Sequence, residues 1–346
     1  MDLDEIERSL MHEVANLDET PEGAYNFRVN GKSISRRSSE NINIESKTDK
    51  SGIDIYIKPN TKNEAVHIPV VISVTGHREA VYNDFHIGAN CEVTIVAGCG
   101  IYNCGTDDSI HDGIHTFYVG KNSKVRYIEK HYGAGPGAGK ILNPVTKIYA
   151  EQGSYVEVIM EQLRGVDSTK RDTYAELDKD AKISIQERLL THGKQTAEST
   201  ITVNLNGKNS TADIVSRAVA QDISRQIFHS NIIGKTACRG HSECDAIIMD
   251  DAKVLATPAL DAQCLDAQLI HEAAIGKIAS EQLTKLMTLG LTRNQAESQI
   301  VNGFLKWQLN HISTQYNITK PIAWASLTIL TIFVGWKKRV VISLNK

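Results

Sequence analysis

The sequence is poor in proline and aromatic residues, with 7 prolines and 6% aromatics in 346 residues. So few aromatic side chains argue against a sandwich with a large aromatic core and favour many short β-branched strands. No excess of positive charge is present either, because 38 Lys and Arg stand against 41 Asp and Glu. This balance excludes a basic nucleic-acid binder. Hydrophobic residues make up 41% of the chain, which is enough for a globular core.

The first eight residues are acidic and lack the apolar stretch of a secretory signal. We therefore expect a cytoplasmic protein whose six cysteines are free thiols. One uncharged run, residues 321–336, is followed by Lys337, Lys338 and Arg339. Its 16 residues fall short of the roughly 20 that span a bilayer. A buried helix or strand, or an altered end of the reading frame, is favoured over a membrane tail anchor.

The middle of the sequence repeats one phrase, in which a small residue is followed by alternating apolar positions. The phrase starts at Cys91, Ser123, Ser154, Ala181 and Ser210, so neighbouring starts lie 27 to 32 residues apart. Alternation with period two indicates strands, and this spacing indicates coils that stack on one another. No amphipathic helix of about 10 residues separates the strands, which argues against a βαβ fold. The sequence therefore predicts a parallel β-helix.

The ends of the chain differ from this repeat. Residues 3–17 have the apolar spacing of a helix, residues 20–43 read as a loop or linker, and residues 280–301 read as two short helices broken at Gly290. We expect four parts: an N-terminal helix and linker (1–45), the β-helix core (46–276), a C-terminal helical segment (277–310) and an atypical apolar and basic tail (311–346).

Two motifs carry the side chains of a metal site. The first contains Cys238, His241, Cys244 and Asp245, and thiolates and imidazole are ligands that iron and zinc prefer. In a strand, residues 238 and 244 share one face while 241 takes the other, and buried structural cysteines are an equal alternative. The second motif, His271-Glu272, follows Cys244 by about one coil. Stacking would bring His271 or Glu272 beside Cys244.

The stretches YNDFHIGANCEVTIVAGCG, HDGIHTFYVGKNSKVRYIEKHYG, GHSECDAIIMD and LIHEAAIGKI resemble the SufB/SufD family of iron-sulfur cluster assembly proteins. The likeness spans about residues 13–305 and is closest to the short SufB forms of minimal assembly systems. It implies a right-handed parallel β-helix (the SufBD core) flanked by helical segments. The tail after residue 305 departs from the family, which puts docking of the SufC ATPase by that tail in doubt.

The resemblance implies a scaffold and not an enzyme. Cys244 would accept sulfur and ligate a transient iron-sulfur cluster of unknown type, with Glu272 as the second and His271 as the third candidate ligand. Cys238, His241 and Asp245 would be secondary candidates. The implied partners are a SufC-type ABC ATPase that hydrolyses ATP, a cysteine desulfurase or sulfur carrier, apo-protein acceptors and a second copy of the chain.

Two other functions remain open. A SufD-like partner subunit would not hold the cluster, although the presence of Cys244 and Glu272 argues against it. A carbohydrate-active β-helix enzyme would need paired carboxylates on a groove. The adjacent acidic pairs of the coil region, Asp107-Asp108 and Asp250-Asp251, both read as turns.

Overall fold

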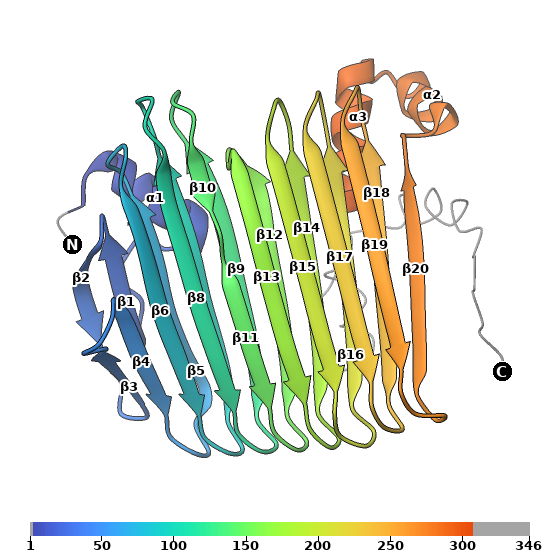
Figure 1. The fold of residues 1–346 in the computed structure, drawn as a ribbon. Helices are drawn as coiled ribbons and strands as arrows, with labels where there is room; N and C mark the ends of the chain where they lie inside the picture. The colour runs from blue at the N-terminus through green and yellow to red at the C-terminus, as the bar shows by residue number, and fades with distance from the viewer. Residues whose placement is uncertain (1–2, 307–346) are drawn as a thin grey trace.

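The structure, a computed structural model, describes residues 3–306. The chain winds into a parallel β-solenoid of about eight turns, which confirms the predicted fold class. Its strands form two ten-stranded sheets, here called sheet A and sheet B, and successive turns stack side by side along the molecule (Figure 1). The predicted tail, residues 311–346, lies outside the described residues.

Each full coil contributes strands to both sheets. Sheet A has the order β2 (Lys32–Arg37), β1 (Ala24–Val29), β5 (Lys62–Ile72), β7 (Glu92–Tyr102), β9 (Lys124–Ala134), β12 (Tyr155–Arg164), β14 (Lys182–Thr191), β16 (Thr211–Ala220), β18 (Arg239–Ile248) and β20 (Gln268–Gly276). Sheet B has the order β19 (Lys253–Ala262), β17 (Arg225–Gly234), β15 (Thr196–Leu205), β13 (Ser168–Leu177), β10 (Lys140–Leu142), β8 (Ser109–Val119), β6 (Arg78–Ile87), β4 (Gly52–Ile57) and β3 (Ile42–Ser46). β11 (Val145–Ala150) also pairs with β13 and β8.

One kind of turn before the sheet A strands explains the repeated phrase. Its last residue has a φ between 57° and 71° in Asn60, Asn90, Asn122, Gly153, Asp180 and Asn209. Asn, Asp and Gly tolerate this left-handed backbone better than other residues do. The next residue in each coil is small and no more than 3% exposed. The turn and the small residue therefore recur together, once per coil.

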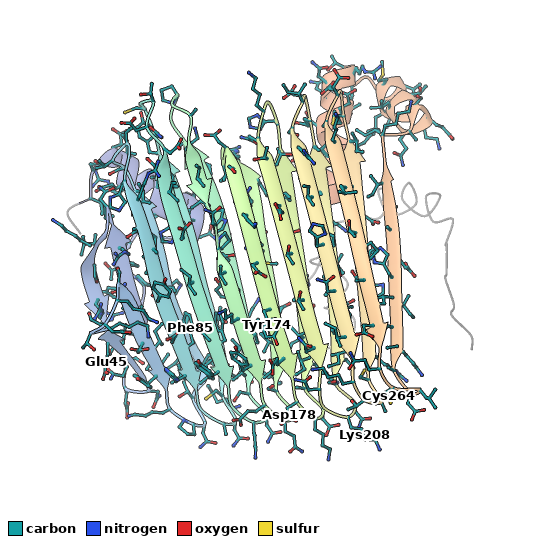
Figure 2. All side chains as sticks on the ribbon, in the orientation of Figure 1. Glu45, Phe85, Tyr174, Asp178, Lys208 and Cys264 are labelled. Atoms are coloured by element: carbon teal, nitrogen blue, oxygen red, sulfur yellow. The ribbon has the colours of Figure 1, made fainter. Side chains whose placement is uncertain are left out.

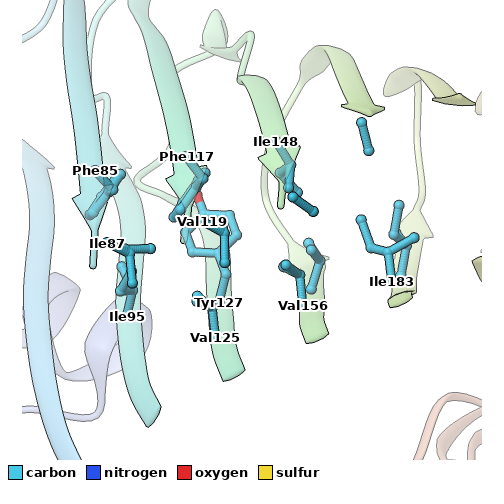
Figure 3. Close-up of a cluster of buried hydrophobic side chains, with 14 of the residues drawn as sticks. Phe85, Ile87, Ile95, Phe117, Val119, Val125, Tyr127, Ile148, Val156 and Ile183 are labelled. Carbon is cyan, nitrogen blue, oxygen red and sulfur yellow. The ribbon is translucent and has the colours of Figure 1, made fainter. Parts of the chain in front are cut away.

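Apolar side chains from both sheets fill the space between them. Phe85 and Phe117 stack with ring centroids 4.4 Å apart, and Tyr127 packs 4.8 Å from Phe117 (Figure 3). All three side chains are fully buried. Burying one such side chain contributes about 1.5 to 3 kcal/mol. The coils are thus held together by a continuous core as well as by their backbone ladders.

The prediction of a loop or linker at residues 20–43 is wrong. These residues contain β1, β2 and the first part of β3, and β1 and β2 form an antiparallel hairpin. Asn30 and Gly31 take the turn with φ values of 46° and 81°. An Asn-Gly pair between two strands is a strong hairpin signal. The polar composition concealed it, because β2 is largely exposed.

Helix α1 (Glu5–Ala15) confirms the predicted N-terminal helix and packs on the outer face of sheet A. A capping box of Asp4 and Glu7 starts it. The helix backbone approaches β7 closely at Gly98, where an added Cβ would lie 2.6 Å from the carbonyl oxygen of Val14. Glycine is therefore required at this contact.

Helices α2 (Ser280–Thr288) and α3 (Arg293–Lys306) confirm the predicted helical pair with its break at Gly290. α3 packs on Val219 and Ile247 at the ends of β16 and β18. No helix among residues 3–306 has both the length and the apolarity to cross a bilayer.

The last coil, formed by β19 and β20, is not covered on its far side by any described residue (Figure 1). Leu260 and Ile275 pair in register with buried core positions, yet each is 39% exposed. Within residues 3–306 the apolar core is therefore uncovered at this end, which we call the open end.

Candidate functional site

The predicted site residues lie mainly on β18 and β20, the last two strands of sheet A. The two strands are parallel and in register, with Ser242 opposite His271, Glu243 opposite Glu272 and Cys244 opposite Ala273. Paired residues keep their side chains on the same face of the sheet, and neighbours along a strand alternate. The backbone of sheet A therefore divides the site into an inner and an outer face.

Cys244 lies on the inner face, within the apolar core, and is 1% exposed. Burial raises the pKa of its thiol to about 12, and the nearby carboxylate of Glu187 adds to the shift. The thiol is consequently protonated at neutral pH, whereas the thiolate is the form that attacks sulfur and binds metals. Before Cys244 can react, a metal ion or a sulfur donor must displace this proton, or a local opening must relieve the burial so that the proton passes to water.

His271 shares the inner face with Cys244, because it pairs with the fully buried Ser242. Burial, followed by the charge of His241, lowers the pKa of His271, so its imidazole is neutral and able to bind a metal. Its Nδ1 atom is buried and accepts or donates no hydrogen bond. An unsatisfied buried nitrogen is costly, and a bound ion would relieve that cost.

Glu272 lies on the outer face, so it does not share a face with Cys244. The pairing of β18 with β20 has no register shift, and no bulge turns Glu272 inward. The structure therefore places His271, and not Glu272, on the face that Cys244 occupies. Alternation along an extended strand is the physical reason.

On the outer face, Glu272 meets His241 and Glu243, with one donor atom from each lying within 4.8 Å of the others. His241 donates its Nδ1 hydrogen to Asp213 Oδ1 at 2.7 Å. This bond is the main cause that raises the pKa of His241, with Glu243 and Glu272 adding to it. Sequence reasoning missed Glu243, although its position two residues after His241 places both on one face.

Asp245 also faces outward, beside Arg217. The Nη2 atom of Arg217 lies 3.5 Å from Glu243 and 4.0 Å from Asp245. The guanidinium is also 5.5 Å from the ring centre of Phe304, so it links the outer face to α3. Asp245 thus belongs to a charge cluster on the outer face, opposite to the face of Cys244.

Cys238 lies on the inner face but far from Cys244 along the chain direction. Six extended residues separate the two thiols, which corresponds to about 20 Å at 3.3 Å per residue. Burial raises the pKa of Cys238, and the charge of Cys264 contributes. Cys264 lies in the turn between β19 and β20 (Figure 2). The Cys238-His241-Cys244 motif therefore does not form a single metal site.

A buried charge network inside the solenoid was also missed by sequence reasoning. Arg171 pairs with Glu129 and lies 3.7 Å from Glu187, and Ser216 donates to Glu187 at 2.9 Å. Ser216 is directly opposite Cys244 in the ladder. The signal in the sequence was a charged residue at a strand position that, by the alternation of side chains, faces inward. This network carries polar groups through the core as far as the neighbourhood of Cys244.

Fold and site together define a β-solenoid protein with thiol, imidazole and carboxylate donors gathered at its open end. Residues 73–304 match the family described as "SUF system FeS cluster assembly, SufBD core domain". The chain belongs to this family, as its sequence motifs indicate. The acidic pairs weighed for a carbohydrate-active enzyme lie in the connections after β7 and β18.

Several relatives are described as iron-sulfur cluster assembly SufBD family proteins. One from Methanothermobacter thermautotrophicus is 29% identical over 64% of this chain and 53% of its own length. One from Archaeoglobus fulgidus is 29% identical over 73% of this chain and 68% of its own length. One from Pyrococcus horikoshii is 26% identical over 77% of this chain and 59% of its own length. The chain thus spans about half the length of the first of these relatives.

Proposed function

We propose that this chain is a scaffold on which an iron-sulfur cluster is built and from which the cluster passes to apo-proteins. The observation that carries the proposal is the shared inner face of Cys244 and the neutral His271 in a SufBD family member, next to the open end. Thiolate and imidazole both ligate iron in iron-sulfur centres. The chain holds the cluster and is not itself an enzyme.

In this proposal Cys244 accepts sulfur from a cysteine desulfurase or a sulfur carrier and becomes a cluster ligand. His271 offers the unpartnered Nδ1 as a second ligand. The thiol of Cys244 loses its proton when the sulfur donor or iron arrives, since its pKa of about 12 keeps it protonated beforehand. Two ligands at the edge of a solenoid hold a cluster weakly, as a transient cluster requires.

A second copy of the chain completes the proposed scaffold as a homodimer. Support comes from the open end, where β19 and β20 are the last strands of the two sheets. Edge strands offer unpaired backbone groups to another strand. Leu260 and Ile275 add uncovered apolar surface there.

An ABC-type ATPase of the SufC kind is the proposed partner that supplies ATP hydrolysis. Helices α2 and α3 support this role, because the family match extends over them to residue 304. Met287 at the end of α2 is 45% exposed, and Leu289 just after it is 79% exposed. We place the assembly in the cytoplasm, where its six unpaired cysteines would stay reduced.

One observation favours a second candidate, a SufD-like partner subunit that takes no sulfur itself. The thiol of Cys244 is almost completely buried, and its ionisation is strongly opposed. A subunit that only supports the assembly has no need of a reactive thiol.

Anaerobic reconstitution of the full chain with ferrous iron and sulfide tests the scaffold, with and without a SufC-type ATPase. We expect wild type to bind a labile cluster, measured by visible absorption and by iron and sulfide per chain. In Cys244→Ala the iron and sulfide bound per chain should fall at least tenfold. Cys99→Ala is the matched control, because Cys99 is also a buried core cysteine but lies on β7.

Equal loss in both variants would attribute the effect to packing and contradict the role of Cys244. Absence of a cluster in wild type with the ATPase present would favour the SufD-like candidate.

A further inference from the structure

The outer face of β18 and β20 carries a donor set that the scaffold chemistry at Cys244 does not use. Glu243 and Glu272 are directly opposite each other in the parallel ladder, and His241 precedes Glu243 by two residues. One donor atom from each lies within 4.8 Å of the others. Donors of one ion with bonds of about 2.1 Å lie roughly 3 to 3.5 Å apart. Side-chain rotation alone can close the difference.

The hydrogen bond from His241 Nδ1 to Asp213 Oδ1 prepares the imidazole for a metal. In the neutral imidazole this 2.7 Å bond keeps the ring proton on Nδ1, so that Nε2 is the nitrogen with a lone pair for a metal. Histidines that bind metals usually have such a carboxylate partner, which orients the ring and raises its basicity. Asp213 lies on β16, so three successive strands of sheet A build the arrangement.

The charges around these donors also favour a cation. Asp213, Glu243, Asp245 and Glu272 bring four carboxylates to one patch of sheet A. The guanidinium of Arg217 lies 3.5 Å from one oxygen of Glu243 and 4.0 Å from Asp245. Among these side chains carboxylates outnumber basic groups, which favours a cation at this patch.

We propose that His241, Glu243 and Glu272 bind one divalent first-row transition metal ion, oriented by Asp213. One imidazole and two carboxylates suit ferrous iron, and three protein ligands leave positions open for exchange. The role of this ion rests on the proposed function: it is the iron destined for the cluster. Iron then loads on the outer face of sheet A while sulfur loads at Cys244 on the inner face.

Anaerobic titration of the full chain with Fe(II), and with Co(II) as a spectroscopic probe, tests this site. We expect one ion per wild-type chain, with a Co(II) spectrum that lacks a thiolate charge-transfer band. His241→Ala and Glu243→Gln should weaken binding at least tenfold. Asp213→Asn, which removes the carboxylate that orients the ring of His241, should weaken it about 10-fold to 100-fold.

His229→Ala is the matched control, because His229 also faces outward on a solenoid strand but lies on β17 of sheet B. It should bind both ions as wild type does. Thermal melting of each variant checks that the fold is retained. We expect it to be, since the four substituted side chains lie on strand surfaces. Cys244→Ala should still bind Fe(II) at this site, since the thiol is on the other face.

Three results would overturn the site: no Fe(II) or Co(II) binding, equal binding by wild type and His241→Ala, or a thiolate band that disappears in Cys244→Ala. The proposed function fails separately. Fe(II) binding with the expected variant profile, in a chain that never assembles a cluster, would keep the metal site and reject the scaffold. Cluster assembly together with unchanged Fe(II) binding in His241→Ala would keep the scaffold and reject the metal site.

Discussion

Cys244 occupies a position where core packing opposes the ionisation that sulfur chemistry needs. Its side chain contributes to the apolar core of the last full coils, and its thiol has a pKa of about 12. His271, on the same face, is kept neutral by burial. At the scale of the residue, the site is therefore a protonated thiol and a neutral imidazole on one face of the sheet. Binding of iron or sulfur must supply the free energy of deprotonation.

This thiol makes stability depend on pH in a specific direction. An unfolded cysteine titrates near pH 8.5, whereas folded Cys244 keeps its proton to about pH 12. The stabilisation is complete below about pH 8.5 and is lost as pH rises from there to about 12. We expect wild type to lose about 2 kcal/mol relative to Cys244→Ala between pH 8.5 and 10.

Thermal or urea unfolding of both proteins across this pH range measures the difference in their free energies of unfolding. The contributions of all titratable groups that the two proteins share cancel in this difference. Cys104→Ala, at an exposed thiol, is the control. A pH-independent difference between wild type and Cys244→Ala would show that the thiol is not protonated preferentially in the folded protein.

Helix α1 is an element whose position depends on one missing side chain. It packs on the outer face of sheet A along β7, where Gly98 and Gly100 point toward it. At Gly98 an added Cβ would meet two backbone oxygens, those of Val14 at 2.6 Å and Lys130 at 2.8 Å. Because backbone atoms lie on both sides of the added Cβ, neither neighbour can move away at low energetic cost.

We expect Gly98→Ala to displace α1 and to destabilise the protein by about 1 to 3 kcal/mol, the usual cost of overpacking. Limited proteolysis should then cleave the first 16 residues faster, and the thermal midpoint should fall. Gly100→Ala is the control, because the atoms nearest its Cβ would be no backbone oxygens but side-chain atoms of Leu10 and Val14, at 3.1 to 3.3 Å. If both variants melt alike, close backbone contact is not what positions α1.

The whole molecule is asymmetric along its axis. Its N-terminal end carries the β1–β2 hairpin and α1, whereas the described part of the chain leaves core-type side chains of the last coil uncovered. A solenoid needs a cover at each end, because every coil buries its apolar face against a neighbour. A second copy at the open end would provide that cover and would bring two candidate sites near one interface.

We expect wild type to be a dimer in sedimentation analysis and Ile275→Asp to weaken dimerisation at least thirtyfold, or about 2 kcal/mol. Ile223→Asp is the control, because Ile223 is also an exposed isoleucine, 57% against 39% for Ile275, but lies in the turn between β16 and β17. Melting of each variant tests folding. A monomeric wild type, or dimers that tolerate Ile275→Asp, would contradict the homodimer.

Much of the fold was predictable because its signals are local. Alternation, turn residues and a period near 30 residues recur at Cys91, Ser123 and Ser154, and each acts within its own coil. The hairpin at Asn30 had a local signal too, but the polar residues of β2 outweighed it. Buried charges such as Glu129 and Glu187 were visible only as exceptions to the alternation.

The sequence by itself determined the solenoid, its helical ends and the two motifs that contain Cys244 and Glu272. Only the tertiary structure decided which motif residues meet, because coil length and register set the pairs across β18 and β20. That register puts His271 with Cys244 on the inner face and Glu272 with His241 and Glu243 on the outer face. A shift of one residue would exchange the two faces, since side chains alternate along a strand.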